Sequence, residues 1–248
     1  MDFGRNSVER ALQDKDAHRS KLKNLISLTA VRVVLMLLLL IAAIAVSFVL
    51  GAIRGIVDSA PELKPDSIAP MGFATSVYDA TGNQVETLVM AGSNREEATY
   101  EELPKNLINA FVAIEDERFW QHNGVDTRSI MRAVVGVIRG TSSSGGGSTI
   151  TQQLIKNNLF NGGREKSFGE KLTRKIQEQY LAMKLERIMS KEVILTNYLN
   201  TINLGSNALG VKVASRRYFN KEVKDLTLSE CTVLAGITQN PSRLNPIT

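Results

Sequence analysis

Residues 113–124 read AIEDERFWQHNG, so acidic residues end an apolar helical pattern and a glycine closes the segment. The pattern is carried by Leu107, Phe111 and Ile114, which recur at the spacing of one helix face. A carboxylate against an apolar wall loses hydration, which raises its proton affinity and suits it to general-base chemistry. Glu115 and Asp116 are therefore candidate catalytic residues. The alternative is a charged helix end whose histidine satisfies a backbone carbonyl, and this segment alone favours that alternative.

The composition of the chain indicates which kinds of partner it favours and excludes an intrachain disulfide. The 248 residues carry a formal net charge of +5 and are 43% hydrophobic. A basic chain of this kind favours anionic partners such as phosphates, lipid headgroups or nucleic acid. The single cysteine, Cys231, excludes an intrachain disulfide and lies in an apolar run, which predicts a buried side chain. The histidines, His18 and His122, form no metal-ligand spacing with it.

Residues 33–53 contain no charged side chain and are long enough to cross a membrane, which takes about 20 helical residues. The apolar core of a signal peptide is only about 7–15 residues long and precedes a cleavage motif, so this run predicts a retained transmembrane helix. Cationic residues before it predict that residues 1–32 are a cytoplasmic tail and that the chain after residue 53 is exported. Those residues are Arg10, Lys15, Arg19, Lys21, Lys23 and Arg32.

The exported part begins with a linker and a turn. Residues 54–72 contain three prolines, which predicts an extended linker. β-forming residues on both sides of residues 79–83 predict a hairpin, in which Gly82 is free to take a positive φ. From Pro104, a suitable first helical residue, the spacing becomes helical, and residues 130–138 form a further amphipathic run.

A loop rich in serine and glycine, residues 142–148, precedes another helical segment, and Ser148 is its predicted N-cap. A helix start presents free backbone N–H groups and the positive end of the helix dipole, which suits a phosphate. An ordinary loop gives the same pattern. The Lys-Ser/Thr pair of a P-loop does not follow these glycines, so the segment is not a P-loop.

Two later helices are predicted to begin at capping boxes, Ser167 with Glu170 and Thr227 with Glu230. At about 100° per residue, the first of these helices separates an apolar face from a charged face. The apolar face is formed by Leu172, Ile176, Tyr180 and Met183, and the charged face by Lys171, Arg174, Lys175 and Glu178. The charged face is either an ordinary solvated surface or a cationic wall with one carboxylate, able to hold a diphosphate and a divalent cation.

Five blocks resemble, in order, those of the peptidoglycan glycosyltransferases, the transglycosylase module of class A penicillin-binding proteins and of monofunctional glycan polymerases. The blocks are residues 115–124, with a Glu-Asp, Phe, His and Gly pattern, 147–153 with Lys156 and Asn157, 174–178, 191–200 and 217–221. The resemblance covers roughly residues 73–248. Thr196 stands where the fourth block usually has a glutamate, which leaves a local salt bridge there unsupported. The family's domain normally extends further and no transpeptidase module follows, so we expect a piece of a longer protein.

The resemblance implies a mainly α, lysozyme-like glycosyltransferase domain at residues 73–248, with a small β-hairpin, on the outer face of the bacterial cytoplasmic membrane. It implies a glycan strand on a polyprenyl diphosphate as donor and lipid II as acceptor, whose sugar 4-hydroxyl attacks the anomeric carbon with inversion. Both substrates are lipid-linked, so a membrane tether raises their effective concentration. The apolar positions Ile130, Val134, Val135 and Ile138 then suit a segment at the membrane interface.

The resemblance also implies roles for individual residues. Glu115 is expected to be the general base, with Asp116 tuning it, and Glu178 to organise the diphosphate directly or through Mg²⁺. Cations are expected to neutralise the leaving diphosphate, and polar residues to bind sugar or phosphate oxygens. The cations are Arg132, Lys156, Lys171, Arg174 and Lys175, and the polar residues are Ser148, Thr149, Gln152 and Gln153. His122, at a helix end, is expected to be structural.

Three other interpretations bear on these expectations. A lysozyme-type glycoside hydrolase shares a catalytic glutamate, but it needs a proton donor and often a second carboxylate about 5–10 Å away. It has no use for the cations beside Glu178, which favour a diphosphate leaving group. A non-catalytic scaffold of the cell-wall machinery is disfavoured because the carboxylates and cations are all present. Export disfavours a nucleic-acid partner, whereas a transpeptidase module or other cell-wall synthesis proteins fit.

Overall fold

The computed structural model describes residues 4–89, 94–138 and 147–247 and divides into two units, Met1–Gly55 and Ile56–Thr248. Helix α1 (Arg5–Asp58) occupies the first unit. Its segment Leu28–Asp58 is long and apolar enough to cross a membrane, and none of its most apolar stretch is buried. Such a helix is consistent with a membrane anchor or a signal sequence. The helix extends beyond residues 33–53 on both sides because no proline interrupts the chain before Pro61.

The second unit begins with a short helix and the expected hairpin. Helix α2 (Pro65–Ile68) interrupts the segment predicted as an extended linker. Strands β1 (Thr75–Tyr78) and β2 (Gln84–Leu88) pair antiparallel, with Thr75 opposite Leu88. Hydrogen bonds from Thr81 and Asn83 close the turn and lower the pKa of the Asp79 carboxyl to about 2. Gly82 has a φ of +86°, so the predicted hairpin is confirmed.

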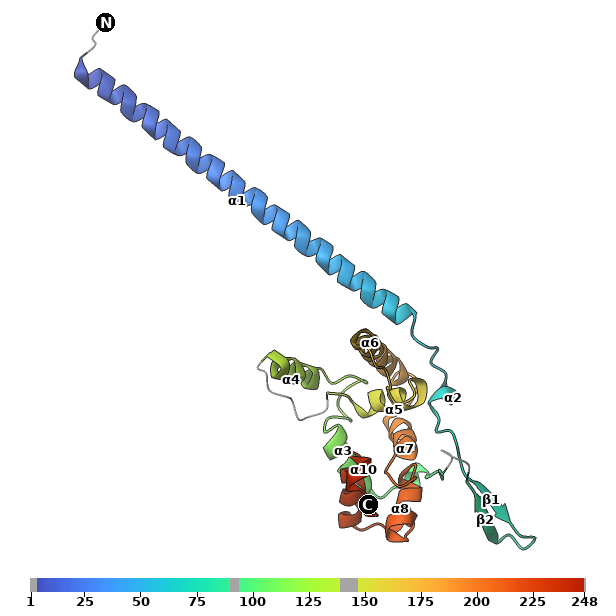
Figure 1. Cartoon of the computed structure of the whole chain (residues 1–248). Helices are drawn as coiled ribbons and strands as arrows, with labels where there is room; N and C mark the ends of the chain where they lie inside the picture. The colour runs from blue at the N-terminus through green and yellow to red at the C-terminus, as the bar shows by residue number, and fades with distance from the viewer. Residues whose placement is uncertain (1–3, 90–93, 139–146, 248) are drawn as a thin grey trace. The chain divides into compact units, whose positions relative to one another are not determined.

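Helices form the rest of the second unit, and the prediction of a mainly helical domain with a hairpin is confirmed (Figure 1). Helix α3 packs against α9, and α5 packs against both α6 and α7. The elements are η1 (Tyr100–Glu102), α3 (Lys105–Glu115), α4 (Thr127–Ile138), α5 (Ile150–Leu159), α6 (Phe168–Leu185), α7 (Lys191–Thr201), α8 (Val211–Phe219), η2 (Val223–Asp225), α9 (Leu228–Ile237) and α10 (Pro241–Leu244).

Helix caps follow local sequence signals with two corrections. The capping boxes at Ser167 and Thr227 are present at the starts of α6 and α9. The N-cap of α5 is Thr149 and not Ser148, because the Thr149 hydroxyl accepts the Gln152 N–H. Pro104 precedes α3 as its N-cap and is not its first helical residue. The predicted burial of Cys231 in α9 is confirmed.

Helix α6 buries a different face from the predicted one. Leu172 is 49% exposed and Met183 is 43% exposed, although both belong to the predicted apolar face. The buried residues are Gln177, Glu178, Leu181, Ala182 and Leu185. Burying a carboxylate such as that of Glu178 costs free energy unless a cation pairs with it. The sequence pattern alone does not reveal this pairing, so it does not predict that the face with Glu178 is buried.

Helix α4 also exposes apolar side chains. Met131 is 64% exposed and Val135 is 38% exposed. The side chains of Val134 and Ile138 lie outside the described residues, as does most of the serine- and glycine-rich loop. The described part of α4 therefore agrees with an amphipathic helix whose apolar residues are not all covered by the domain.

Candidate active site

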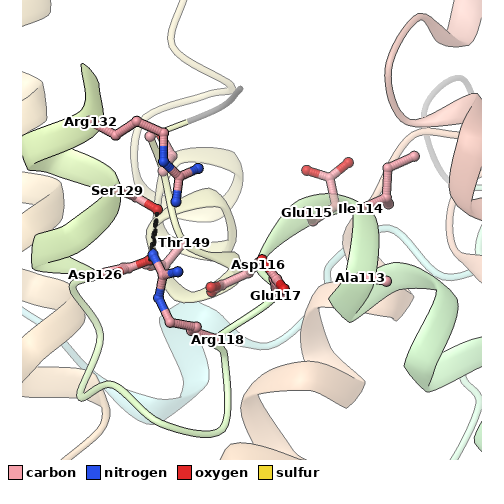
Figure 2. A pocket seen from close by; sticks show the side chains of 12 residues that line it. Ala113, Ile114, Glu115, Asp116, Glu117, Arg118, Asp126, Ser129, Arg132 and Thr149 are labelled. Atoms are coloured by element: carbon pink, nitrogen blue, oxygen red, sulfur yellow. Dashed lines mark hydrogen bonds and ion pairs between the residues drawn. The ribbon is translucent and has the colours of Figure 1, made fainter. Parts of the chain in front are cut away.

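A cavity of about 140 Å³ lies where the end of α3 faces the start of α4 and the approach to α5. Figure 2 shows Glu115 and Arg132, from α3 and α4, on opposite sides of this cavity. Ser148 and Thr149 complete the wall that precedes α5. The first and second sequence blocks therefore meet at one site.

Glu115 is the last residue of α3, and its partly exposed carboxylate accepts hydrogen bonds from three neutral side chains. Gln153 Nε2 donates to Oε2 at 2.7 Å, and Gln239 Nε2 donates to Oε1 at 3.2 Å. The Thr238 hydroxyl also donates to Oε1. These donors fix the orientation of a carboxylate that carries no cationic partner among the described residues.

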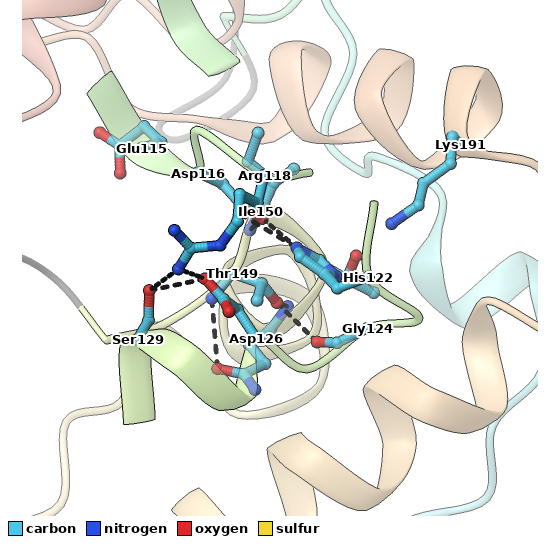
Figure 3. Close-up of polar contacts among 12 residues, drawn as sticks. Glu115, Asp116, Arg118, His122, Gly124, Asp126, Ser129, Thr149, Ile150 and Lys191 are labelled. Carbon is cyan, nitrogen blue, oxygen red and sulfur yellow. Dashed lines mark hydrogen bonds and ion pairs between the residues drawn. The ribbon is translucent and has the colours of Figure 1, made fainter. Parts of the chain in front are cut away.

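Asp116 is turned away from its neighbour and is buried. Nε2 of His122 lies 3.0 Å and 2.9 Å from its two carboxylate oxygens, and the Ile150 N–H donates to Oδ2 at 3.0 Å (Figure 3). Through Nε2, His122 therefore contacts a carboxylate and not the backbone carbonyl of the alternative interpretation. Asp116 thus connects the end of α3 to the start of α5.

A second buried carboxylate, Asp126, holds the start of α4. The Ser129 hydroxyl donates to Oδ2 at 2.7 Å, and the Arg118 guanidinium donates to the same oxygen (Figure 3). The Arg128 N–H donates to Oδ1 at 3.0 Å. Burial alone would raise the pKa of Asp126, but the hydrogen bonds from Ser129 and Arg118 outweigh it and hold that pKa well below its usual range. The sequence pattern alone does not reveal this network.

Three cations, Lys156, Arg174 and Lys175, gather around Glu178 and form the group we call the cationic cluster. Glu178 has a fully buried side chain that pairs with Arg174 through one oxygen and with Lys175, at 2.8 Å, through the other. Lys175 Nζ also donates to the Ser148 hydroxyl at 2.8 Å, which connects α6 to the wall of the cavity. The predicted cationic wall with one carboxylate is therefore present, with the carboxylate at its interior.

Lys156 of α5 joins this cluster from the side of Glu115. Burial, followed by the charges of Lys175 and Arg174, lowers the pKa of Lys156, although Glu178 and Glu115 raise it. Three cations thus share two carboxylates, since Arg174 also pairs with Glu165 at 2.7 Å. The cluster itself therefore has one cation more than its paired carboxylates, Glu178 and Glu165, and Glu115 is a further carboxylate close enough to raise the pKa of Lys156.

Not every predicted binding residue faces the cavity. The Gln152 side chain is buried and accepts the Thr149 N–H at 3.3 Å, while the Thr149 hydroxyl donates to the Gly124 carbonyl at 2.7 Å. These two residues hold the start of α5. Lys171 is exposed near the start of α6 and forms no ion pair with Glu178, whereas Arg132 is exposed and lines the cavity.

Gly124 brings the segment after α3 against the backbone of α6. Its φ is +86°, and a Cβ atom there would lie 2.5 Å from the carbonyl carbon and oxygen of Ala182. Any side chain at this position would therefore displace α6 or the segment itself.

The fourth block supports the same segment. The Lys191 ammonium lies 4.3 Å from the centre of the buried Phe119 ring and pairs with Glu186 at 2.8 Å. Thr196, which replaces the family's glutamate, donates its hydroxyl to the Glu192 carbonyl within α7 at 2.8 Å. The substitution thus leaves a satisfied side chain.

The expected Mg²⁺ site on Glu178 does not fit these residues. Both oxygens of Glu178 are occupied by Arg174 and Lys175. Within residues 4–89, 94–138 and 147–247, no group of three histidine, cysteine or acidic residues could hold a metal ion. Hard divalent cations require several oxygen ligands, and the cationic cluster offers none that is free.

The site combines a partly exposed, hydrogen-bonded carboxylate with a cationic cluster, as an enzyme does that transfers a group away from an anionic leaving group. The family described as Transglycosylase matches residues 81–248. The chain belongs to this family, and these residues form its peptidoglycan glycosyltransferase domain.

The chain is similar to class A penicillin-binding proteins. Penicillin-binding protein 1A of Clostridium acetobutylicum is 44% identical over 219 residues, which cover 86% of this chain and 26% of that protein. Penicillin-binding protein 1F of Bacillus subtilis is 43% identical over 174 residues, which cover 70% of this chain and 23% of that protein. The chain spans about a quarter of the length of the curated relatives it matches.

Proposed function

We propose that the domain polymerises lipid II into glycan strands, with a growing strand on a polyprenyl diphosphate as donor. The observation that carries this proposal is that Glu115, at the cavity, lies close to the cationic cluster of Lys156, Arg174 and Lys175 without forming an ion pair with it. A carboxylate base activates a hydroxyl, and a cluster with excess positive charge accepts a diphosphate. Membership of the transglycosylase family supports the same reaction.

The proposed reaction is a single displacement at the anomeric carbon. Glu115 accepts the proton of the acceptor's 4-hydroxyl as that oxygen forms its bond to the donor's anomeric carbon. The bond from this carbon to the diphosphate oxygen breaks with its electron pair, and the configuration inverts. Gln153, Thr238 and Gln239 keep the carboxylate oriented through the three hydrogen bonds described above.

The diphosphate leaves with its negative charge beside the cationic cluster. The diphosphate would favour the charged form of Lys156, whose pKa is lowered by burial and by the neighbouring Lys175 and Arg174. Glu178 takes no proton in this scheme. It holds Arg174 and Lys175 in place, and it is a positioning residue for the cluster.

A lysozyme-type hydrolase fits the site less well. Asp116 is committed to His122 and Asp126 to Arg118, so neither is free as the second carboxylate that many hydrolases use. A hydrolase also has no role for the cationic cluster. A scaffold without catalysis leaves the same cluster and the cavity unexplained.

The membrane location belongs to this proposal. We assign the apolar part of α1 as a single transmembrane anchor, with the N-terminus in the bacterial cytoplasm and the catalytic domain on the outer face. The lipid bilayer and the lipid-linked substrates are then its direct partners. The relatives are about four times longer than the matched region, which makes a transpeptidase module or other cell-wall synthesis proteins the expected further partners.

The proposal is tested with labelled lipid II and the detergent-solubilised protein. We expect Glu115→Gln to lower the rate of polymer formation about 100- to 10,000-fold, the range of general-base catalysis. Glu101→Gln, the same change at an exposed glutamate of η1, is the control and should polymerise normally. Cleavage of preformed glycan by the wild type would establish the hydrolase instead, and equal rates for both variants would remove Glu115 as the base. Parallel reactions with Mg²⁺ or with EDTA test the expected cation.

A further inference from the structure

A larger cavity, of about 670 Å³, lies beyond the last turn of α5. Its wall comes from the segment after β2, the turn after α5 and the connection between α7 and α8, and no residue of the Glu115 cavity lines it. This volume falls within the range of small-molecule sites, about 300–1,000 Å³. Its polar lining is formed by Arg95, Asn157, Asn158, Asn161, Arg164 and Asn203.

Arg95 is the most informative of these residues because it is buried without a counter-ion. It is 8% exposed, its terminal NH2 group donates to the Thr201 carbonyl at 3.2 Å, and its Nε is buried without a hydrogen-bond partner. The pKa of Arg95 is lowered, and burial alone causes this. Within the described residues, no carboxylate pairs with this guanidinium, and the undescribed residues 90–93 next to it carry none.

Other arginines of the domain are paired differently. Arg118 pairs with Asp126, and Arg174 pairs with Glu165 and Glu178. A buried charge normally has such a partner because the unpaired ion loses its hydration without compensation. Arg95 is therefore a buried cation at the edge of a cavity that has room for an anion.

The backbone holds Arg95 in this place. Its carbonyl accepts the Ala74 N–H at 3.0 Å, and its main chain forms an isolated parallel bridge with Leu209. The preceding residue, Asn94, donates its side-chain amide to the Asn207 carbonyl at 2.7 Å. A side chain fixed at its base in this way is preorganised for a ligand.

We infer that this cavity binds an oxyanion, a carboxylate or a phosphate, carried by a small polar ligand. The Arg95 guanidinium, which pairs with no carboxylate of the described residues, is the inner cation, and the exposed Arg164 is a second cation at the rim. The asparagine amides offer donors and acceptors to hydroxyl or amide groups of the same ligand. The second sequence block thus serves two sites, since Lys156 belongs to the cationic cluster and Asn157 lines this cavity.

Arginine modification by phenylglyoxal, located by peptide mass spectrometry, tests the site in the full detergent-solubilised chain. The probes are inorganic phosphate and N-acetylalanine, each compared with chloride at equal ionic strength. An anion at about twice its Kd should slow modification of Arg164 about threefold and leave the exposed Arg187 unchanged. Protection by one probe and not the other distinguishes a phosphate ligand from a carboxylate ligand.

Asn157→Asp provides the decisive variant, because it places a carboxylate of nearly the same shape in the cavity. It should raise the Kd of the anion at least about tenfold, through repulsion of the anion and pairing with the arginines, so that the same anion concentration slows modification of Arg164 only about 1.2-fold. Asn106→Asp, on the exposed face of α3, is the matched control and should retain protection. Equal modification of Arg164 with and without both anions, or full protection in Asn157→Asp, would overturn the inference. A melting temperature equal to that of the wild type shows that each variant is folded.

Discussion

Glu115 and Asp116 are adjacent in the sequence but occupy opposite environments. Glu115 ends α3 and is partly exposed, whereas Asp116 leaves the helix with φ −161° and ψ 72° and is buried against His122. Two carboxylates whose surroundings differ in this way are suited to different tasks. Glu115 is accessible from the cavity, whereas Asp116 holds in place the segment that carries Glu115.

Thr238 provides a test of how Glu115 is held. Thr238→Val removes the hydroxyl that donates to Glu115 and keeps the shape of the side chain. We expect kcat for lipid II polymerisation to fall about tenfold with little change in KM, because about 1.4 kcal/mol of transition-state positioning is lost. Steady-state kinetics measure this effect.

The control for this experiment is Thr232→Val in the same helix. Its hydroxyl donates to the Ser229 carbonyl at 2.8 Å, as the Thr238 hydroxyl does to Ala235 at 2.7 Å, but it has no contact with Glu115. Equal kinetics for the two variants would show that the hydroxyl at residue 238 contributes only to the end of α9.

At the scale of elements, the sequence predicted correctly those features that depend on contacts between residues close together in the chain. The hairpin turn and the capping boxes at Ser167 and Thr227 depend on residues three or four positions apart, and the structure contains them. The inner face of α6 was predicted wrongly because Glu178 is buried by cations that its own helix supplies. Thr238 and Gln239 were missed because they reach Glu115 from more than 120 residues away in sequence.

Helix α4 depends on Asp126 for its start. Asp126→Ala removes the acceptor of the Ser129 hydroxyl, the Arg128 N–H and the Arg118 guanidinium. We expect the free energy of unfolding to fall by about 1–2 kcal/mol, the usual cost of a lost helix cap, and amide exchange in α4 to rise. Hydrogen–deuterium exchange with mass spectrometry measures the local effect, and thermal denaturation the global one.

Asp225→Ala, at an exposed position in η2, is the matched control for this change. Faster exchange in α4 for both variants, or for neither, would contradict a specific role of Asp126.

At the scale of the whole molecule, several carboxyl groups stabilise the fold only while they are ionised. Hydrogen bonds from Lys221 and Thr227 lower the pKa of Glu230 to about 2, and the pKa values of Glu102 and Asp126 are also lowered. A carboxyl group of this kind stabilises the folded protein above its unfolded pKa of about 4 and loses that contribution as the pH falls through its folded pKa.

The melting temperature of the protein should therefore be nearly constant above about pH 5 and fall between about pH 4 and pH 2. Thermal denaturation followed by circular dichroism over this range measures the effect. Lys221→Ala removes the main cause of the low pKa of Glu230 and should make the fall shallower. A melting temperature that stays constant down to pH 2 would contradict the assignment of these carboxylates.

The contact of Gly124 with α6 determines how closely the segment after Glu115 approaches that helix. Main chain meets main chain there, one helical turn from Glu178, so no rotamer intervenes between the segment after Glu115 and α6. The approach of the segment after Glu115 to α6 is therefore limited by contact between main-chain atoms. If Glu115 and the cationic cluster act as proposed, this main-chain contact, and no side-chain rotamer, sets how far apart the two lie.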